Sequence, residues 1–372
     1  MNKNLVNYIE KFEEICKNPK KMIDDHKAKT GKGAVGVLPL YAPEEIIDAA
    51  GYLPIGIWGG TKEISEARGV FPPFACSIAQ SIMEYKACGV YDALETVLIS
   101  VPCDTLKCLS QKWNGNEIVF THPQNRKIEA ANLFLVEEYK IIKRKLEDIL
   151  KVTISDEAIK ESIKIYNENR RLMREFCELA NDHLDIVTPT VRHNVIKSRW
   201  FMTKADHTKL VKEFIELLKA EPAVEWKGKK VILTGILAEP AELLHIFEEE
   251  NLAVVADDLA QESRQFRNDV PEGEADPLYA LAKWWQDLEG CALATDPKKV
   301  RGQMLIDLVK QYKADGVVVC MLKFCDPEEF DYPVYYREFT EAGINNTIIE
   351  VDLSTAAFGQ TKTKIQTFSE IL

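Results

Sequence analysis

Residues 97–109 run Val97-Leu-Ile-Ser-Val-Pro-Cys-Asp-Thr-Leu-Lys-Cys-Leu109 and join a short apolar segment to a cysteine at the start of an expected helix. The run Val97 to Val101 is typical of a strand in a buried parallel sheet. Asp104 and Thr105 favour a helix start, so free backbone amides should point at the Cys103 sulfur and favour its thiolate. The segment therefore predicts a soft anion beyond the carboxyl end of a strand, where open α/β sheets bind ligands.

Two further cysteines stand at similar junctions. Gly316-Val-Val-Val-Cys-Met-Leu-Lys-Phe-Cys-Asp-Pro-Glu-Glu329 gives a buried strand, then Cys325, then a proline at a favourable first helical position. Cys76 follows a rigid turn in Phe71-Pro-Pro-Phe-Ala-Cys-Ser-Ile-Ala-Gln80 and precedes the helical run 78–87. Three such junctions in one chain favour a shared chemical role over simple packing.

Composition limits the class of protein. The chain has 372 residues and 46% hydrophobic content, which is typical of two or three globular domains with full cores. A net charge of -12 argues against nucleic acid or an anionic membrane surface as partner. The first 14 residues do not resemble a signal peptide, and no apolar run reaches membrane-spanning length. We expect a cytoplasmic protein whose nine cysteines are thiols or metal ligands.

Alternating strand and helix patterns predict a doubly wound α/β fold with two parallel-sheet lobes. Strands are expected at 34–40, 51–58, 97–101 and 116–122, and again at 228–237, 252–256 and 346–351, with one more between Gly316 and Cys325 that includes Cys320. Helical patterns alone fill the middle third of the chain. The expected division is an N-terminal lobe with a leading helix (1–154), a helical connector (155–225) and a C-terminal lobe (226–372).

The other cysteines have weaker signals. Cys16 and Cys177 lie on apolar helical stripes, and Cys291 has no strand before it, so all three are interpreted as structural. A helix from Asp104 would carry Cys108 more than a turn from the helix start, and Cys320 lies inside an expected strand. Cys108 and Cys320 could support a metal site without binding to it directly.

Three charged or polar features each leave two interpretations open. His122 follows an expected strand, but a lone histidine there is more often structural than a ligand or base. Glu44 and Glu45 at a helix start would complement the helix dipole, or else lie beside a cluster or partner. The charged segment 257–267 would form a solvated or salt-bridged rim, or else bind a partner or tune a nearby site. The segment 234–240 lacks the glycines and lysine of nucleotide loops, which leaves NAD and ATP binding unsupported.

Cys76, Cys103 and Cys325 would converge if the carboxyl ends of the two sheets face one another across a cleft. Thiolates without histidine suit an iron–sulfur cluster or zinc. Three thiolates would leave one iron of a [4Fe–4S] cluster open to another ligand. The alternative is three separate buried thiols, or a non-enzymatic zinc or ligand-binding scaffold of two lobes.

The chain resembles the β subunits of (R)-2-hydroxyacyl-CoA dehydratases, a family that includes 2-hydroxyglutaryl-CoA dehydratase D-components and benzoyl-CoA reductase-like subunits. The likeness runs from Gly33 to Phe368. It is carried by Phe74-Ala-Cys-Ser, Cys103-Asp-Thr-Leu-Lys-Cys-Leu, Phe120-Thr-His-Pro-Gln-Asn-Arg, Asp257-Asp-Leu-Ala-Gln-Glu-Ser-Arg-Gln and Lys323-Phe-Cys-Asp-Pro-Glu-Glu.

The resemblance implies an anaerobe's αβ heterodimer in which Cys76, Cys103 and Cys325 hold a [4Fe–4S] cluster. It further implies a separate ATP-dependent [4Fe–4S] activator that supplies one electron. The electron would reach the 2-hydroxyacyl-CoA, bound mainly by the α subunit, and give a ketyl radical anion from which water is eliminated. This chain would then relay or tune the electron.

Within the family, residues 100–113 look most like the β subunits of lactoyl-CoA dehydratases, which convert lactoyl-CoA to acryloyl-CoA and water. A dehydratase for another 2-hydroxyacyl-CoA and a benzoyl-CoA-reductase-like enzyme are the alternatives. One departure from the family is Lys364, where related sequences tend to have arginine. Lysine keeps the charge but loses the bidentate fork, so an anion contact carried over from arginine is in doubt.

Overall fold

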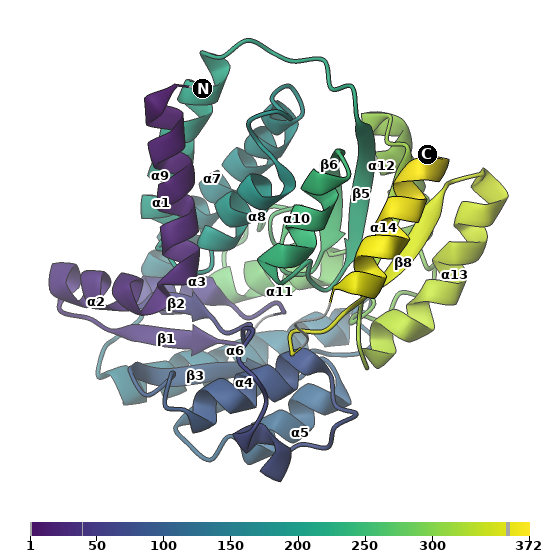
Figure 1. Ribbon diagram of the computed structural model, residues 1–372. Helices are drawn as coiled ribbons and strands as arrows, with labels where there is room; N and C mark the ends of the chain where they lie inside the picture. The colour runs from purple at the N-terminus through teal and green to yellow at the C-terminus, as the bar shows by residue number, and fades with distance from the viewer. Residues whose placement is uncertain (1, 39, 355–357) are drawn as a thin grey trace.

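The computed structural model describes residues 2–38, 40–354 and 358–372. Within them lie two four-stranded parallel sheets, of strand order β2-β1-β3-β4 and β6-β5-β7-β8, in separate lobes (Figure 1). The predicted α/β fold is therefore confirmed. The strands are β1 (Ala34–Val37), β2 (Leu53–Gly56), β3 (Leu94–Ser100), β4 (Glu117–Phe120), β5 (Lys229–Gly235), β6 (Leu252–Leu259), β7 (Gly316–Leu322) and β8 (Asn346–Val351).

The two lobes repeat one topology. In the first, α3 (Glu44–Ala49), α4 (Ser77–Ala87) and α5 (Asp104–Lys112) connect the four strands in turn, and a 3-10 turn at Glu66–Gly69 precedes α4. In the second, the corresponding helices are α10 (Ala241–Glu249), α12 (Arg301–Tyr312) and α13 (Asp326–Ala342). Between β6 and α12 the second lobe also carries a 3-10 turn (Ser263–Gln265) and α11 (Pro277–Asp287), and α14 (Gly359–Ile371) follows β8. The central strand pairs β1–β3 and β5–β7 mark the switch points at which such sheets bind ligands.

Close packing restricts which residue can stand at the end of β5. Gly235 has a φ of 142°, and a Cβ there would lie 2.2 Å from the carbonyl oxygen of Cys320 on the neighbouring strand. Only glycine combines this backbone conformation with so close an approach between strands. The loop that leaves β5 toward the other lobe is fixed by this contact.

Helices α6 (Glu129–Leu150), α7 (Asp156–Ala180), α8 (Pro189–Ser198) and α9 (Lys204–Lys219) occupy the middle of the chain. Ser155 caps α7, because its side chain accepts a hydrogen bond from the Ala158 amide. The N-terminal helix α1 (Lys3–Lys17) packs on α8 and α9, where the Phe12 and Phe214 rings meet at 5.4 Å, and α2 (Pro19–Thr30) follows it (Figure 1). The leading helix thus lies with the connector helices in space.

Buried ion pairs join the connector helices to both lobes. On the first lobe, Glu44 and Glu45 are 7% and 3% exposed, so neither is a simple exposed partner of a helix dipole. They pair instead with cations of α7 and α9. The pairs are Lys204–Glu44 at 2.7 Å, Arg170–Glu45 at 2.5 Å and, on the second lobe, Arg192–Asp257 at 2.6 Å.

The charged segment 257–267 is salt-bridged, as one interpretation of it allowed, but its acids are buried and do not form a solvated rim. Asp257 and Asp258 belong to β6 and, like Arg264, are at most 4% exposed. Asp257 pairs with the distant Arg192, and Asp258 pairs with Arg264 and Arg267 of the same segment and with the distant Arg301. The buried charges are therefore compensated. Of the helices in the described ranges, none is both long and apolar enough to cross a membrane.

Candidate metal centre

Each of the three cysteines chosen from the sequence is the residue immediately before a helix. Cys76 is the N-cap of α4, Cys103 of α5 and Cys325 of α13. All three have non-helical backbone angles, as an N-cap residue requires. The predicted strand–cysteine–helix junctions at Cys103 and Cys325 and the predicted turn–cysteine–helix junction at Cys76 are confirmed.

The structure brings these cysteines near one another across the two lobes. Cys325 of the second lobe interacts electrostatically with Cys76 and Cys103 of the first, and Cys76 with Cys103. The Asp326 carboxylate also acts on both first-lobe thiols. In the part of the chain that the structure describes, no three His, Cys, Asp or Glu side chains are placed to hold a single metal ion.

The thiols are not ready-made thiolates. Burial raises the pKa of Cys76 to about 12, although the amides of Ala79 and Ile78 act to lower it. Burial also raises the pKa of Cys103 and Cys325, against the amides of their own helix starts. The helix-start amides thus act in the expected direction, but desolvation outweighs them. A bound cation would have to supply the remaining stabilisation of the thiolates.

The turn between β7 and α13 is strained. Phe324 has a φ of 61°, in the left-handed region that bulky residues rarely adopt. The Cys325 amide donates to the Leu322 carbonyl oxygen at 3.0 Å and closes the turn. This geometry places Cys325 three residues beyond its strand end and costs on the order of 1–3 kcal/mol.

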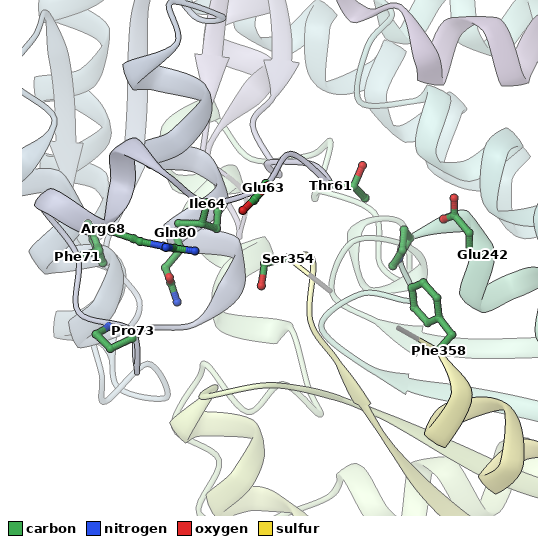
Figure 2. A pocket seen from close by; sticks show the side chains of 11 residues that line it. Thr61, Glu63, Ile64, Arg68, Phe71, Pro73, Gln80, Glu242, Ser354 and Phe358 are labelled. Atoms are coloured by element: carbon green, nitrogen blue, oxygen red, sulfur yellow. The ribbon is translucent and has the colours of Figure 1, made fainter. Parts of the chain in front are cut away.

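A cleft lies between the lobes and is lined by Pro73 and Gln80, which stand on either side of Cys76 in the sequence. Its volume is about 990 Å³, which is within the range of small-molecule sites. Figure 2 shows Arg68, Phe71 and Gln80 of the first lobe on one side and Glu242 and Phe358 of the second on the other. The Gln80 side chain also donates to the Ala75 carbonyl oxygen at 2.6 Å, which fixes the turn before Cys76. Gln80 therefore both lines the cleft and fixes the turn that leads into Cys76.

The cleft is not strongly cationic. Among its lining residues that the structure describes, Arg68 is the one cation, and the two carboxylates Glu63 and Glu242 line the same cleft. A ligand with several phosphate charges is poorly matched by such a surface.

The remaining cysteines lie elsewhere. Cys320 is in β7 and fully buried, and Cys108 is exposed on α5, so both occupy the positions expected of them. Cys291 is buried and accepts hydrogen bonds from the Tyr41 hydroxyl at 2.8 Å and from Arg264. Its structural assignment agrees with these contacts.

His122 is a structural residue in this fold. It is 3% exposed, and its Nε2 lies 3.2 Å from the Tyr41 carbonyl oxygen, to which only a protonated nitrogen can donate. Burial lowers the pKa of His122 to about 4, so the ring is neutral near pH 7. Its ring centroid lies 4.4 Å from that of Trp285.

One group of residues near Cys325 was not identified from the sequence. Glu328 in the first turn of α13 is fully buried and pairs with Arg301, whose Nη1 lies 2.8 Å from Glu328 Oε2. Arg301 also reaches Asp258 of β6 at 2.9 Å. The segments that carry Asp258 and Glu328 were quoted for their resemblance, but no signal in the sequence distinguished Arg301 from a surface arginine.

Comparison with known proteins gives a consistent result over nearly the whole chain. Residues 39–372 match the family model of 2-hydroxyglutaryl-CoA dehydratase, D-component. The chain is 57% identical to the lactoyl-CoA dehydratase subunit beta of Anaerotignum propionicum, with 98% of each chain covered. It is 44% identical to the (R)-phenyllactyl-CoA dehydratase beta subunit of Clostridium sporogenes, with 97% of each covered. With the (R)-2-hydroxyglutaryl-CoA dehydratase subunit beta of Acidaminococcus fermentans the identity is 37%, with 98% of each covered.

Proposed function

Because the chain belongs to the 2-hydroxyglutaryl-CoA dehydratase D-component family, we propose that it is the β subunit of a 2-hydroxyacyl-CoA dehydratase. Such an enzyme is a hydro-lyase built from different subunits. The full-length similarity to three dehydratase β subunits supports the assignment and implies a partner α subunit.

The second part of the proposal is that Cys76, Cys103 and Cys325 hold a [4Fe–4S] cluster. The carrying observation is that these three thiols cap three helices from two lobes and interact with one another. The donor set fits the group, since a cluster prefers soft thiolates and bonds each one to a different iron. Such a cluster does not require the three sulfurs to meet around one ion.

When bound, the cluster would supply a centre that takes up and passes on one electron. The chain's own residues would place it: the helix-start amides face the sulfurs, and the turn at Phe324 leads into Cys325 at the start of α13. We propose that an ATP-dependent [4Fe–4S] activator delivers the electron, and that this subunit relays or tunes it for the α subunit.

For the substrate we propose lactoyl-CoA, converted to acryloyl-CoA and water. The support is the order of identities, 57% to the lactoyl-CoA enzyme against 44% and 37% to the phenyllactyl-CoA and 2-hydroxyglutaryl-CoA enzymes. The cleft, lined by one cation and two carboxylates, favours binding of the CoA moiety mainly on the α subunit. A cytoplasmic location and lobe boundaries at 154/155 and 225/226 belong to the same proposal. The location is supported by the nine cysteines, none of which is in a disulfide.

The test is anaerobic co-expression with the α subunit, followed by metal analysis and assay with the activator, ATP and a reductant. We expect about four irons per β chain and dehydration of lactoyl-CoA at a higher kcat/KM than phenyllactyl-CoA or 2-hydroxyglutaryl-CoA. Zinc without iron would contradict the cluster. Reduction of an aromatic acyl-CoA ring without dehydration would contradict the assigned reaction, and a preference for another 2-hydroxyacyl-CoA would contradict the assigned substrate.

A further inference from the structure

A small cavity lies where the first lobe, the connector helices and the second lobe meet. Its walls include the segment 41–45 of the first lobe, Arg170 and Arg199 of the connector helices, and Gln265 and Trp284 of the second lobe. The cavity measures about 10 Å³, which admits a single water molecule or monoatomic ion and excludes a phosphate or an acyl group. A particle bound there contacts all three parts of the fold.

Arg199 brings a positive charge to this cavity without a carboxylate partner. The residue follows α8 and is 2% exposed, and its Nε donates to the Asn169 side-chain oxygen at 2.8 Å. Among the described residues no carboxylate forms an ion pair with it, whereas the buried Arg192 and Arg301 have carboxylates at 2.6 Å and 2.8 Å. Burial lowers the pKa of Arg199, and the charge of Glu44 offsets this only in part. The Arg199 charge is therefore incompletely compensated.

Arg170 of α7 lines the same cavity and has an unused donor. It is 3% exposed, its Nη2 donates to Glu45 at 2.5 Å, and its Nη1 donates to Asn167 Oδ1 at 2.9 Å. Its buried Nε has no hydrogen-bond partner among the residues that the structure describes. A buried N–H group is unfavourable unless an acceptor reaches it. The cavity thus combines an unpaired donor with an unpaired positive charge.

The buried charges around the cavity do not balance. The cations are Arg170, Arg199 and Lys204, and the buried carboxylates are Glu44 and Glu45. Lys204 pairs with Glu44 at 2.7 Å and Arg170 pairs with Glu45, so Arg199 is the third cation against two carboxylates. One negative charge would complete the set, because buried charges are stable only when they are paired.

The next carboxylate on α3 does not complete the set. Asp48 is half-buried, lies outside the cavity wall and accepts a hydrogen bond from the Ser162 hydroxyl at 2.7 Å. Among the described residues it forms no ion pair with Arg199 or Lys204, so it acts on these cations only from a distance.

We propose that the cavity binds one small monovalent anion, chloride, between the Arg170 Nε–H group and the Arg199 guanidinium. The ion supplies both the missing acceptor and the missing negative charge. A water molecule could accept the hydrogen bond but would leave the positive charge uncompensated. The bound anion stabilises the contact of the connector helices with both lobes, and the proposal is independent of the cluster and of the dehydratase assignment.

The experiment is equilibrium unfolding of the full chain in urea, with sodium chloride replaced by sodium gluconate at constant ionic strength. Gluconate is too large for the cavity. One chloride bound only to the folded chain makes the unfolding constant fall about tenfold for each tenfold rise in chloride above the dissociation constant. Arg199→Gln removes the uncompensated charge, keeps a donor for Asn169 and should lose this dependence. Arg171→Gln is the control, because Arg171 is exposed on α7, and it should keep the dependence.

A second measurement does not require that a variant folds. Crystals of the wild-type protein grown with sodium bromide should show an anomalous scattering peak between Arg170 and Arg199. The anion site would be overturned by a water molecule without anomalous signal at that place, by a wild type that does not respond to chloride, or by an equal response in Arg199→Gln. The dehydratase assignment is decided separately by the iron content and the activity.

Discussion

Cys103 and Cys325 occupy the same position in two lobes of the same strand order: each caps the helix that follows the third strand of its sheet. Both therefore stand beside a switch point, where the connections of the neighbouring strands leave in opposite directions. Cys76 caps the helix that precedes the third strand of the first lobe. Its counterpart in the second lobe is the start of α12, at Val300 and Arg301.

The first prediction concerns iron retention. Cys103→Ala should lose most of the about four irons per chain, because one anchor of the proposed cluster is removed. Cys108→Ala, on the same helix but exposed, and Cys177→Ala, on α7, should keep them. Iron and acid-labile sulfide per chain, measured anaerobically, decide the matter. Equal loss of iron in all three variants would show that the ranking of the thiols is wrong.

The second prediction concerns the turn before Cys76. Gln80→Leu removes the hydrogen bond from its side chain to the Ala75 carbonyl oxygen, worth about 1 kcal/mol. Transfer of iron to a chelator should become about fivefold faster. Gln111→Leu is the control, because Gln111 is exposed on the helix that Cys103 caps. If both variants release iron at the wild-type rate, Gln80 does not fix this turn.

The third prediction concerns the buried pair Lys204–Glu44. Lys204→Met would remove the cation that pairs with the buried Glu44 and leave it the Tyr166 hydroxyl as hydrogen-bond donor, which should lower the free energy of unfolding by about 3 kcal/mol. The double variant Lys204→Met/Glu44→Gln should recover part of the loss. Lys212→Ala breaks an exposed pair with Glu168 and should cost less than about 1 kcal/mol. Denaturant unfolding would contradict this prediction if Lys204→Met and Lys212→Ala had equal effects.

The fourth prediction concerns pH. Burial lowers the pKa of His207 to about 3, below its ordinary value of 6.5, and its Nδ1 accepts a hydrogen bond from the Asn169 amide. Between these values the unfolded chain takes up a proton that the folded protein excludes. Above pH 6.5 the His207 ring is neutral in both states and does not reduce the free energy of unfolding. As the pH drops from 6.5 toward 3, this group lowers the free energy of unfolding by up to about 1.4 kcal/mol per pH unit. His207→Gln should reduce the loss of stability between pH 7 and pH 5, and an unchanged pH slope would contradict this assignment.

Local patterns predicted the elements that carry the candidate site. The junctions at Cys103 and Cys325 are defined by short-range features, an apolar run followed by helix-starting residues, and the structure has the helices beginning at Asp104 and Asp326. The strand expected at 346–351 is found at Asn346–Val351. Such features are visible in sequence because they depend on neighbours along the chain.

Long-range partners could not be predicted in the same way. Asp258 was placed in a possible solvated rim, but it is buried because Arg264, Arg267 and the distant Arg301 compensate its charge. The predicted thiolate character of Cys103 failed for a similar reason: desolvation by the assembled lobes outweighs the amides of its own helix. In both cases the deciding energy comes from tertiary burial, which no local pattern encodes.

The unequal share of sulfurs between the lobes has a mechanical consequence for the proposed centre. The first lobe contributes Cys76 and Cys103, whereas the second contributes Cys325 alone, since a valine and an arginine stand where a fourth sulfur would fit. If the two lobes moved apart, only the attachment through Cys325 would have to be lost. The cluster would then stay with the first lobe, which would hold it through two thiolates. The C-terminal lobe would be attached to the cluster only through the residue that follows the strained turn at Phe324.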